Sequence, residues 1–248
     1  HMHADHVTGL LGILMLSSQV DREEPLYIFG PPKIAEFVDQ NRHLLDMYIN
    51  YEIIVREIYE AGTIWQGDDY SIRAFPLKHT KMCFGYALEE SKRPGVFYPE
   101  KALALGVPRG PLWSELQSGK TVRLTEGSSI KPSEVMGEPR SGRKFSFVTD
   151  TLYFPEIAQE VSNSDLLICE GMFEHALIES AVDKRHMTAR QAALIARDAG
   201  NIKKLGLIHY SPRYADRELK ILLDEAREVF PDTVLTKDRM RFPIEFVD

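Results

Sequence analysis

His1-Met2-His3-Ala4-Asp5-His6 gathers three imidazoles and one carboxylate within six residues. Imidazole and carboxylate are ligands that zinc and similar ions accept. In an extended segment His1 and His3 point to the same side, and Asp5 and His6 can then turn toward a second ion. A vector remnant could supply His1-Met2, but not His3, Asp5 and His6 at this spacing. The stretch therefore predicts a site for two metal ions.

Length and composition narrow the class of protein. The chain has 248 residues, of which 44% are hydrophobic and 27% are charged, so a single globular α/β or sandwich-type domain is expected. No apolar run is long enough to cross a membrane, so we expect no membrane association. Cys83 and Cys169 lie far apart and form no disulfide framework, which is typical of a cytoplasmic protein. The net charge of −7 argues against a general nucleic-acid binder.

The charge is unevenly distributed along the chain. The segment 92–144 contains ten basic and five acidic residues, so its net charge is +5, and the rest of the chain carries −12. A basic insert in an acidic protein suggests a local contact with a polyanion. The alternative is a solvated loop with ordinary lysines, and charge alone favours that alternative.

Four predicted strands end next to residues with metal or proton chemistry. These residues are His79, Asp150, Glu170 and His209, after the strands predicted at 71–76, 145–148, 165–169 and 205–208. Catalytic groups collect at such positions because rigid strands hold them while water and substrate can still reach them. We therefore expect these four side chains to belong to the site that begins with His1.

Other signals place the remaining elements. A helix is predicted over 188–200, because Thr188 and Gln191 form a capping box and Gly200 marks its end. Residues 7–16 are expected to run from a loop into a helix. A last strand is expected near 242–246.

Several segments carry a resemblance to a known family. The histidine cluster followed by Gly9-Leu10-Leu11-Gly12 resembles the HxHxDH signature of the metallo-β-lactamase superfamily. Further motifs are similar to those of the ribonuclease Z family within it, in the family's order over nearly the whole chain. They are Phe84-Gly85-Tyr86 after His79, Gly106-Val107-Pro108-Arg109-Gly110-Pro111, Gly142-Arg143-Lys144 leading to Thr149-Asp150-Thr151, His186-Met187-Thr188, and His209-Tyr210-Ser211-Pro212-Arg213-Tyr214. The HxHxDH motif alone specifies the superfamily, whereas the other motifs together are much more specific.

The resemblance implies an α/β fold, the metallo-β-lactamase αββα sandwich, with two zinc ions in a cleft. Manganese or another divalent ion could replace zinc. His1, His3 and His79 would hold one ion, Asp5, His6 and His209 the other, and Asp150 would bridge them. Seven protein ligands leave an open position for water, which marks a catalytic site. Two adjacent cations lower the pKa of that water and clamp phosphate oxygens, and Asp5 would orient the hydroxide or take its proton.

The resemblance also implies a general acid. His186, paired with Glu170, would protonate the ribose 3′ oxygen that leaves, and the carboxylate would favour the charged form of the ring. The alternative is an ordinary surface histidine beside Lys184 and Arg185. The chain departs from the family pattern around Glu170, where it has Cys169-Glu170-Gly171-Met172-Phe173.

The function implied is that of an endoribonuclease that removes the 3′ trailer from precursor tRNA and leaves a 3′-hydroxyl. The whole chain, 1–248, would form one domain, and the segment 92–144 would be a protruding basic arm that grips tRNA. Family members often form homodimers in which each arm serves the other subunit's cleft. The expected substrate-binding residues are Lys92, Arg93, Arg109, Gly110, Pro111 and Arg213. Trp113 and Tyr98 would either stack on bases or pack within the arm.

The family has strands before the HxHxDH motif that this chain lacks, so we expect the natural protein to be longer. Two rival functions remain open at this point. One is a phosphodiesterase or sulfatase of the same fold that acts on small esters. The other is a non-catalytic RNA-binding fragment, which the missing strands suggest.

Overall fold

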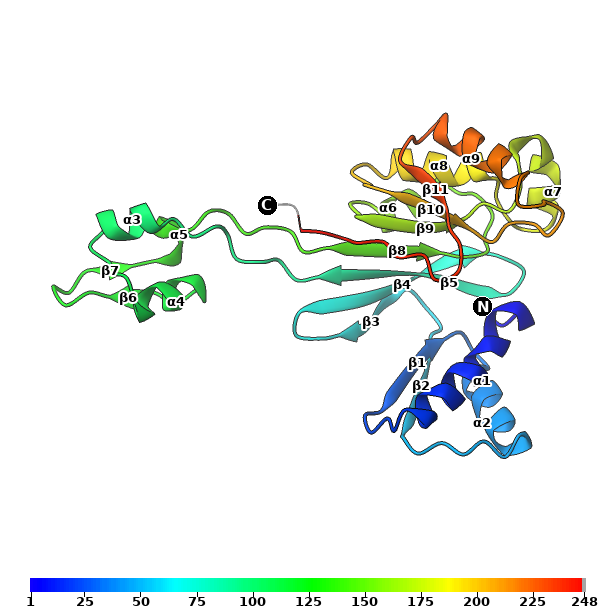
Figure 1. Cartoon of the computed structure of the whole chain (residues 1–248), viewed down its shortest axis with the longest axis horizontal. Helices are drawn as coiled ribbons and strands as arrows, with labels where there is room; N and C mark the ends of the chain where they lie inside the picture. The colour runs from blue at the N-terminus through cyan, green and yellow to red at the C-terminus, as the bar shows by residue number, and fades with distance from the viewer. Residues whose placement is uncertain (247–248) are drawn as a thin grey trace. The chain divides into compact units, whose positions relative to one another are not determined.

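The computed structural model describes residues 1–246, which fold into two compact units (Figure 1). Unit 1 contains His1–Glu89 and Lys144–Ile244. Unit 2 contains Glu90–Arg143, together with Glu245 and Phe246. Within residues 1–246, no helix combines the length and the apolar character needed to cross a bilayer.

A mixed seven-stranded sheet is the centre of unit 1. Its strand order is β11-β10-β9-β8-β5-β4-β3. The strands are β3 (Gly62–Gln66), β4 (Tyr70–Lys78), β5 (Met82–Glu90), β8 (Lys144–Val148), β9 (Leu166–Glu170), β10 (Leu205–Ile208) and β11 (Thr233–Leu235). Strands β8, β9, β10 and β11 run parallel to one another, and β8 is antiparallel to its other neighbour, β5. All five residues of β9 are buried, as expected for a parallel strand with neighbours on both sides.

Helices α8 (Ala189–Asp198) and α9 (Leu219–Arg227) cover one face of this sheet (Figure 1). The buried face of α8 is rich in alanine, which allows the helix to approach β9 and β10 closely. Leu167 and Leu207 of those strands lie in the same core cluster as Leu222 of α9. Shorter elements connect the layers: α6 (Ile157–Glu160), the 3₁₀ helix His175–Leu177 and α7 (Ile178–Asp183).

A second, smaller sheet is made of β1 (Leu26–Gly30) and β2 (Ile53–Glu57), which are parallel. Helices α1 (Ala4–Gln19) and α2 (Ile34–Leu44) pack against it around a buried core of Leu14, Ile28, Ile34 and Val38. A further cluster joins this sheet to the larger one: Ile58, Ala74 and Phe84, with Phe29, Ile64 and Tyr86 against them. The two sheets therefore lie between two pairs of helices, which confirms the expected α/β sandwich.

Three expectations about individual elements were wrong or incomplete. Residues 242–246 form no strand, since Pro243 has no N–H for a ladder, and β11 is the last strand. Helix α1 begins at Ala4 instead of after a loop, so Asp5 lies in its first turn, where a carboxylate is favoured by the helix dipole. Strand β3 was not predicted.

Unit 2 has its own small core. Its elements are α3 (Pro99–Ala104), α4 (Pro111–Gln117), β6 (Val122–Arg123), β7 (Ser129–Ile130) and α5 (Pro132–Val135). They enclose Ala102, Val107, Leu116, Val122, Leu124, Ile130 and Val135. The two ends of the segment run together: the Glu90 N–H donates to the Arg143 carbonyl at 2.9 Å, and the Glu90 carboxylate accepts from the Arg143 Nε at 2.8 Å. At Gly95 a Cβ atom would lie 1.9 Å from the Gly137 carbonyl oxygen, so only glycine fits.

Candidate metal centre

All seven predicted ligands lie together in unit 1. They come from the loop and first turn of α1 (His1, His3, Asp5 and His6), the β4–β5 turn (His79), the end of β8 (Asp150) and the end of β10 (His209). Two groups of them have ligand atoms within 4.8 Å of one another: His1, His3, His79 and Asp150 in one group, and Asp5, His6 and His209 in the other. The groups match the two predicted metal positions.

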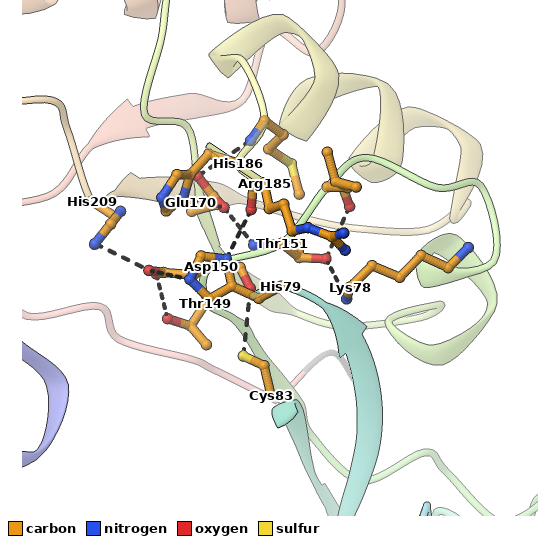
Figure 2. Close-up of polar contacts among 12 residues, drawn as sticks. Lys78, His79, Cys83, Thr149, Asp150, Thr151, Glu170, Arg185, His186 and His209 are labelled. Atoms are coloured by element: carbon orange, nitrogen blue, oxygen red, sulfur yellow. Dashed lines mark hydrogen bonds and ion pairs between the residues drawn. The ribbon is translucent and has the colours of Figure 1, made fainter. Parts of the chain in front are cut away.

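Asp150 belongs to the first group and also faces the second, and Figure 2 shows it together with His79 and His209. Its Oδ2 atom is 3.6 Å from the Nε2 atom of His1, 3.3 Å from that of His6 and 3.9 Å from that of His79. Its Oδ1 atom is 3.5 Å from the His209 Nε2 atom. One carboxylate therefore faces imidazoles of both groups, as a bridging ligand must.

The donor atoms fit divalent cations. Three buried imidazole nitrogens in this centre have no hydrogen-bond partner: His1 Nε2, His6 Nε2 and His209 Nδ1. A buried polar atom without a partner is costly, so it needs an explanation. The His1 and His6 atoms both lie near the Asp150 carboxylate, where a cation would satisfy them. A set of five imidazoles and two carboxylates suits zinc, which accepts nitrogen and oxygen ligands.

The electrostatics of the centre favour neutral imidazoles and a charged carboxylate. Burial lowers the pKa of His3, His79 and His209, so these rings have free lone pairs at neutral pH, the form that binds metals. His6 is the exception, since its interaction with Asp150 raises its pKa. Burial alone would raise the pKa of Asp150, but His6 and His209 outweigh it, and the pKa lies well below its usual value.

His186 and Glu170 form the predicted pair. The His186 Nδ1 atom is 3.1 Å from Glu170 Oε1, and Glu170 is fully buried. Glu170 also accepts the N–H of Thr151 at 2.6 Å and that of Met187 at 3.4 Å (Figure 2). The His186 ring stacks on that of His209, with 5.3 Å between centroids. The Glu170 carboxylate is thus fixed by two backbone N–H groups, and it orients the His186 ring beside the predicted metal ligands.

One electrostatic expectation for this pair was wrong. Burial lowers the pKa of His186 and raises that of Glu170 well above its usual value. Glu170 therefore does not make the charged form of the ring the resting state, because both partners lose their hydration together. His186 also has suitable spacing to form a ligand group with Asp150 and His209.

Sequence reasoning missed four groups that hold the predicted ligands. The His79 Nδ1 atom lies 2.9 Å from the Arg185 carbonyl oxygen, and His3 Nε2 lies 3.3 Å from Thr80 Oγ1. The hydroxyl of Thr149 donates to Asp150 Oδ1 at 3.0 Å, and the Cys83 Sγ atom lies 3.5 Å from His1 Nδ1. Thr80, Thr149 and Cys83 adjoin motif residues, but nothing in the sequence pairs them with particular ring nitrogens.

Three of the predicted substrate-binding residues adjoin one helix of unit 2. Arg109 is exposed, and its guanidinium carbon is 5.9 Å from the centre of the Trp113 ring. Gly110 precedes α4 with φ at 149°, and Pro111 is the first residue of that helix. The Trp113 indole N–H donates to the Val107 carbonyl at 3.2 Å, so this side chain packs within unit 2.

The other predicted contacts lie elsewhere. Lys92 is exposed, while the Arg93 guanidinium carbon lies 3.7 Å from the centre of the Phe246 ring. Arg213 belongs to unit 1 and lies 4.9 Å from the centre of the Phe173 ring. Arg93 thus already has an aromatic partner within unit 2, whereas Lys92 extends into solvent.

Comparisons with known proteins show which proteins the chain resembles. No family model matches the chain. Ribonuclease Z of Treponema denticola is 62% identical over 248 residues, which cover 100% of this chain and 80% of that protein. Ribonuclease Z of Borrelia hermsii is 43% identical over 249 residues, covering 97% of this chain and 77% of that protein.

Solved structures show the same fold. The short form of human tRNase Z matches with a TM-score of 0.66 and 19% identity, covering 99% of this chain and 77% of that one. The metallo-β-lactamase fold protein YhfI from Bacillus subtilis matches with a TM-score of 0.56 and 19% identity, covering 95% and 71%. The structural matches show the fold, and the identity to the two ribonuclease Z sequences shows the family. The chain belongs to the ribonuclease Z family of hydrolytic endoribonucleases.

Proposed function

We propose that this endoribonuclease is zinc-dependent, removes the 3′ trailer from precursor tRNA and leaves a 3′-hydroxyl on the tRNA. The observation that carries the metal requirement is the convergence of seven side chains with ligand atoms, among which the buried nitrogens His1 Nε2 and His6 Nε2 have no hydrogen-bond partner. The names of the relatives, ribonuclease Z and tRNase Z, support the choice of substrate.

Two carboxylates of the site have different surroundings and therefore different roles. When bound, two zinc ions lower the pKa of a water molecule and neutralise charge on the phosphate. The Asp150 side chain is only 3% exposed, which suits a bridging ligand. The Asp5 side chain is 68% exposed, and its Oδ2 atom lies 3.4 Å from His6 Nε2 and 3.9 Å from His209 Nε2. Asp5 can therefore both contact the centre and accept a proton from attacking water.

His186 donates the proton that the leaving 3′ oxygen needs. Its Nδ1 atom is held by Glu170, so its Nε2 atom is left to face the substrate. Because burial lowers the pKa of the ring, we infer that His186 gains its proton only when a phosphate brings negative charge beside it. A neutral resting ring also limits repulsion between His186 and the two cations.

Unit 2 is the arm that binds the tRNA body in this proposal. Its exposed cations, Lys92, Lys101, Arg109, Lys120, Arg123 and Lys131, come from the segment whose net charge is +5. Such side chains bind phosphates without reading the base sequence, and folded RNA is recognised mainly through its shape. The acidic rest of the chain confines the attraction to this unit.

We also propose that the enzyme is a homodimer in the cytoplasm. Helix α1 exposes Ile13 and Leu16, and Val20 follows it, with exposed fractions of 56%, 63% and 76%. A second copy of the same helix would bury this apolar face, as a symmetric interface requires. Cys83 and Cys169 are unpaired thiols, which supports a reducing compartment.

The direct test is cleavage of a precursor tRNA that carries a 3′ trailer by the zinc-loaded protein. We expect one cut that releases the trailer and leaves a 3′-hydroxyl on the tRNA, and no cut by the Asp150→Ala variant. If the zinc-loaded protein hydrolyses a small phosphodiester but leaves the precursor intact, the small-ester function takes the place of this one. If it binds no zinc, the proposed mechanism is wrong.

A further inference from the structure

The turn between β4 and β5 contacts the histidine cluster at several points. The segment that runs from this turn into β5, His79-Thr80-Lys81-Met82-Cys83, supplies one ligand and then approaches the loop before α1. The Lys81 ammonium donates to the Met2 carbonyl at 3.0 Å, and Cys83 at the start of β5 reaches His1. Four residues of this segment, His79, Thr80, Lys81 and Cys83, thus contact the part of the chain that carries His1 and His3.

Each imidazole of the first ligand group has one nitrogen directed inward and one directed outward. The inward atoms are His1 Nε2, which lies 3.6 Å from Asp150 Oδ2, and His79 Nε2 and His3 Nδ1, which lie 3.3 Å apart. The outward atoms meet Cys83 Sγ for His1, Thr80 Oγ1 for His3 and the Arg185 carbonyl for His79. All three outward partners are able to accept a hydrogen bond.

The choice of nitrogen matters because a neutral imidazole carries one proton. A metal binds the unprotonated nitrogen, so the proton must sit on the other one, and a partner there fixes the tautomer. If His1 binds a metal through Nε2, its proton lies on Nδ1, which can donate to the Cys83 sulfur 3.5 Å away. The His1 side chain is fully buried and Cys83 is only 1% exposed, so water does not readily replace the thiol.

Cys83 also connects two ligands. Its S–H group donates to the backbone carbonyl of Asp150 at 3.4 Å (Figure 2), while its sulfur can accept from His1. A thiol can do both at once, since it is a weak donor and a weak acceptor.

We propose that Cys83 is a positioning residue that fixes the Nδ1–H tautomer and the orientation of the His1 ring. By contacting both residues, it also holds the His1 ring in place relative to Asp150. It binds neither metal nor substrate itself. Its contribution is to prepare the first ligand group before an ion arrives. The inference rests on the proposed metal-dependent function, because it assigns His1 as a ligand.

The wild-type protein offers a first test without any substitution. Long-range ¹H–¹⁵N NMR correlations of the zinc-free, histidine-labelled chain at pH 8 report which nitrogen of each ring is protonated. We expect His1 in the Nδ1–H form. If His1 is found in the Nε2–H form, the proposal is overturned.

Zinc affinity provides the second test, measured by competition with a coloured chelator. For Cys83→Ala we expect zinc affinity to fall about 10- to 100-fold at the position that His1 serves, while the second position is unchanged. This is the usual effect of removing the hydrogen-bond partner of a metal-binding histidine. Cys83→Ser keeps a donor and an acceptor on a shorter bond, so we expect it to bind more tightly than Cys83→Ala. The matched control is Cys169→Ala, which removes the same atom from a fully buried cysteine whose Sγ meets Met187 Sδ at 4.0 Å.

Unchanged zinc affinity in Cys83→Ala, or an equal loss in the serine and alanine variants, contradicts the proposal. So does an equal loss in Cys169→Ala, which would point to general loosening of the core. If Cys83→Ala does not fold by circular dichroism, the NMR result and the serine variant decide. Neither test contains RNA, so wild-type protein that binds zinc and leaves precursor tRNA uncut refutes the proposed function but not the role of Cys83.

Discussion

At the residue scale, Asp150 shows how the centre combines groups from distant parts of the chain. Its carboxylate lies within 4 Å of nitrogens from His1, His6, His79 and His209. These residues arrive from the beginning of α1 and from the ends of β4 and β10. A carboxylate that is buried among imidazoles stays ionised because they outweigh its loss of hydration.

The role of His186 leads to a prediction at this scale. We expect His186→Ala to lower the cleavage rate about 10²- to 10⁴-fold, the usual contribution of a general acid, while both zinc ions stay bound. The measurements are single-turnover cleavage of precursor tRNA and zinc content. His43→Ala is the control, because His43 has an exposed side chain that meets only Asp39 across one helical turn. Loss of zinc in His186→Ala would instead make His186 a ligand with Asp150 and His209.

At the element scale, the strand ends place the site and one helix start supports it. Strands β4, β9 and β10 each end at or one residue before a predicted group, and Asp150 follows β8 by two residues. Helix α8 begins directly after His186-Met187-Thr188. The backbone that carries His186 is therefore fixed by the cap of α8.

This arrangement predicts the effect of removing the cap. Thr188 accepts the Gln191 N–H at 3.2 Å, and the Thr188 N–H donates to the Gln191 side chain at 3.0 Å. We expect Thr188→Ala to lower the free energy of unfolding by about 1 kcal/mol, and Thr188→Ser to lower it less because the hydroxyl is kept. Urea unfolding measures both. Equal losses in the two variants would mean that the methyl group, rather than the cap, provides the stability.

Unit 2 gives a second prediction at the element scale. Because the Glu90 N–H meets the Arg143 carbonyl, a short turn can replace residues 92–141 without moving β5 or β8. We expect this deletion to abolish cleavage of precursor tRNA while hydrolysis of a small phosphodiester and zinc binding continue. Parallel assays with the two substrates check it. Retained tRNA cleavage would refute the proposal that unit 2 is the tRNA-binding arm.

At the scale of the whole molecule, buried histidines make the stability of the metal-free protein depend on pH. Burial lowers the folded-state pKa of four rings, those of His3, His79, His186 and His209. The unfolded chain then binds more protons below its pKa of about 6.5, so folding free energy is lost as pH falls. Two groups oppose this: His6 and Glu170 have raised pKa values, so at each of them the folded chain holds its proton more tightly than the unfolded chain does.

We therefore expect the metal-free protein to unfold at lower urea concentration at pH 5.5 than at pH 7.5. Urea titrations in the presence of a chelator at three pH values test this. The window lies above the range in which Asp150, with its lowered pKa, takes up a proton. Stability that stays constant or rises toward pH 5.5 would show that these rings are not neutral in the folded state.

The proposed dimer is also a property of the whole molecule. We expect Leu16→Glu to convert the dimer to a monomer, since a charge on the apolar face of α1 cannot be buried between two copies. Sedimentation equilibrium measures the mass. Val182→Glu on α7, where the side chain is 53% exposed, is the matched control and should leave the mass unchanged. A monomeric wild-type protein would exclude this dimer.

The sequence by itself determined the fold family, the seven candidate ligands and the pairing of His186 with Glu170. It could do so because the motifs that resemble those of the ribonuclease Z family carry these residues, and because His79, Asp150, Glu170 and His209 fall next to the ends of predicted strands. The cap of α8 could be predicted because it is local. Residues 242–246 and α1 show where local patterns were insufficient, since helix and strand boundaries depend on neighbours as well as on propensity.

Only the tertiary structure decided which atoms meet. The contact of Cys83 with His1, that of Thr80 with His3, and the Arg185 carbonyl behind His79 join segments that are about 80 or more residues apart. The lowered pKa of His186 likewise depends on burial, which the chain acquires only when it folds. Tautomer and pKa are set by the groups that surround a ring, and spacing along the sequence does not specify those groups.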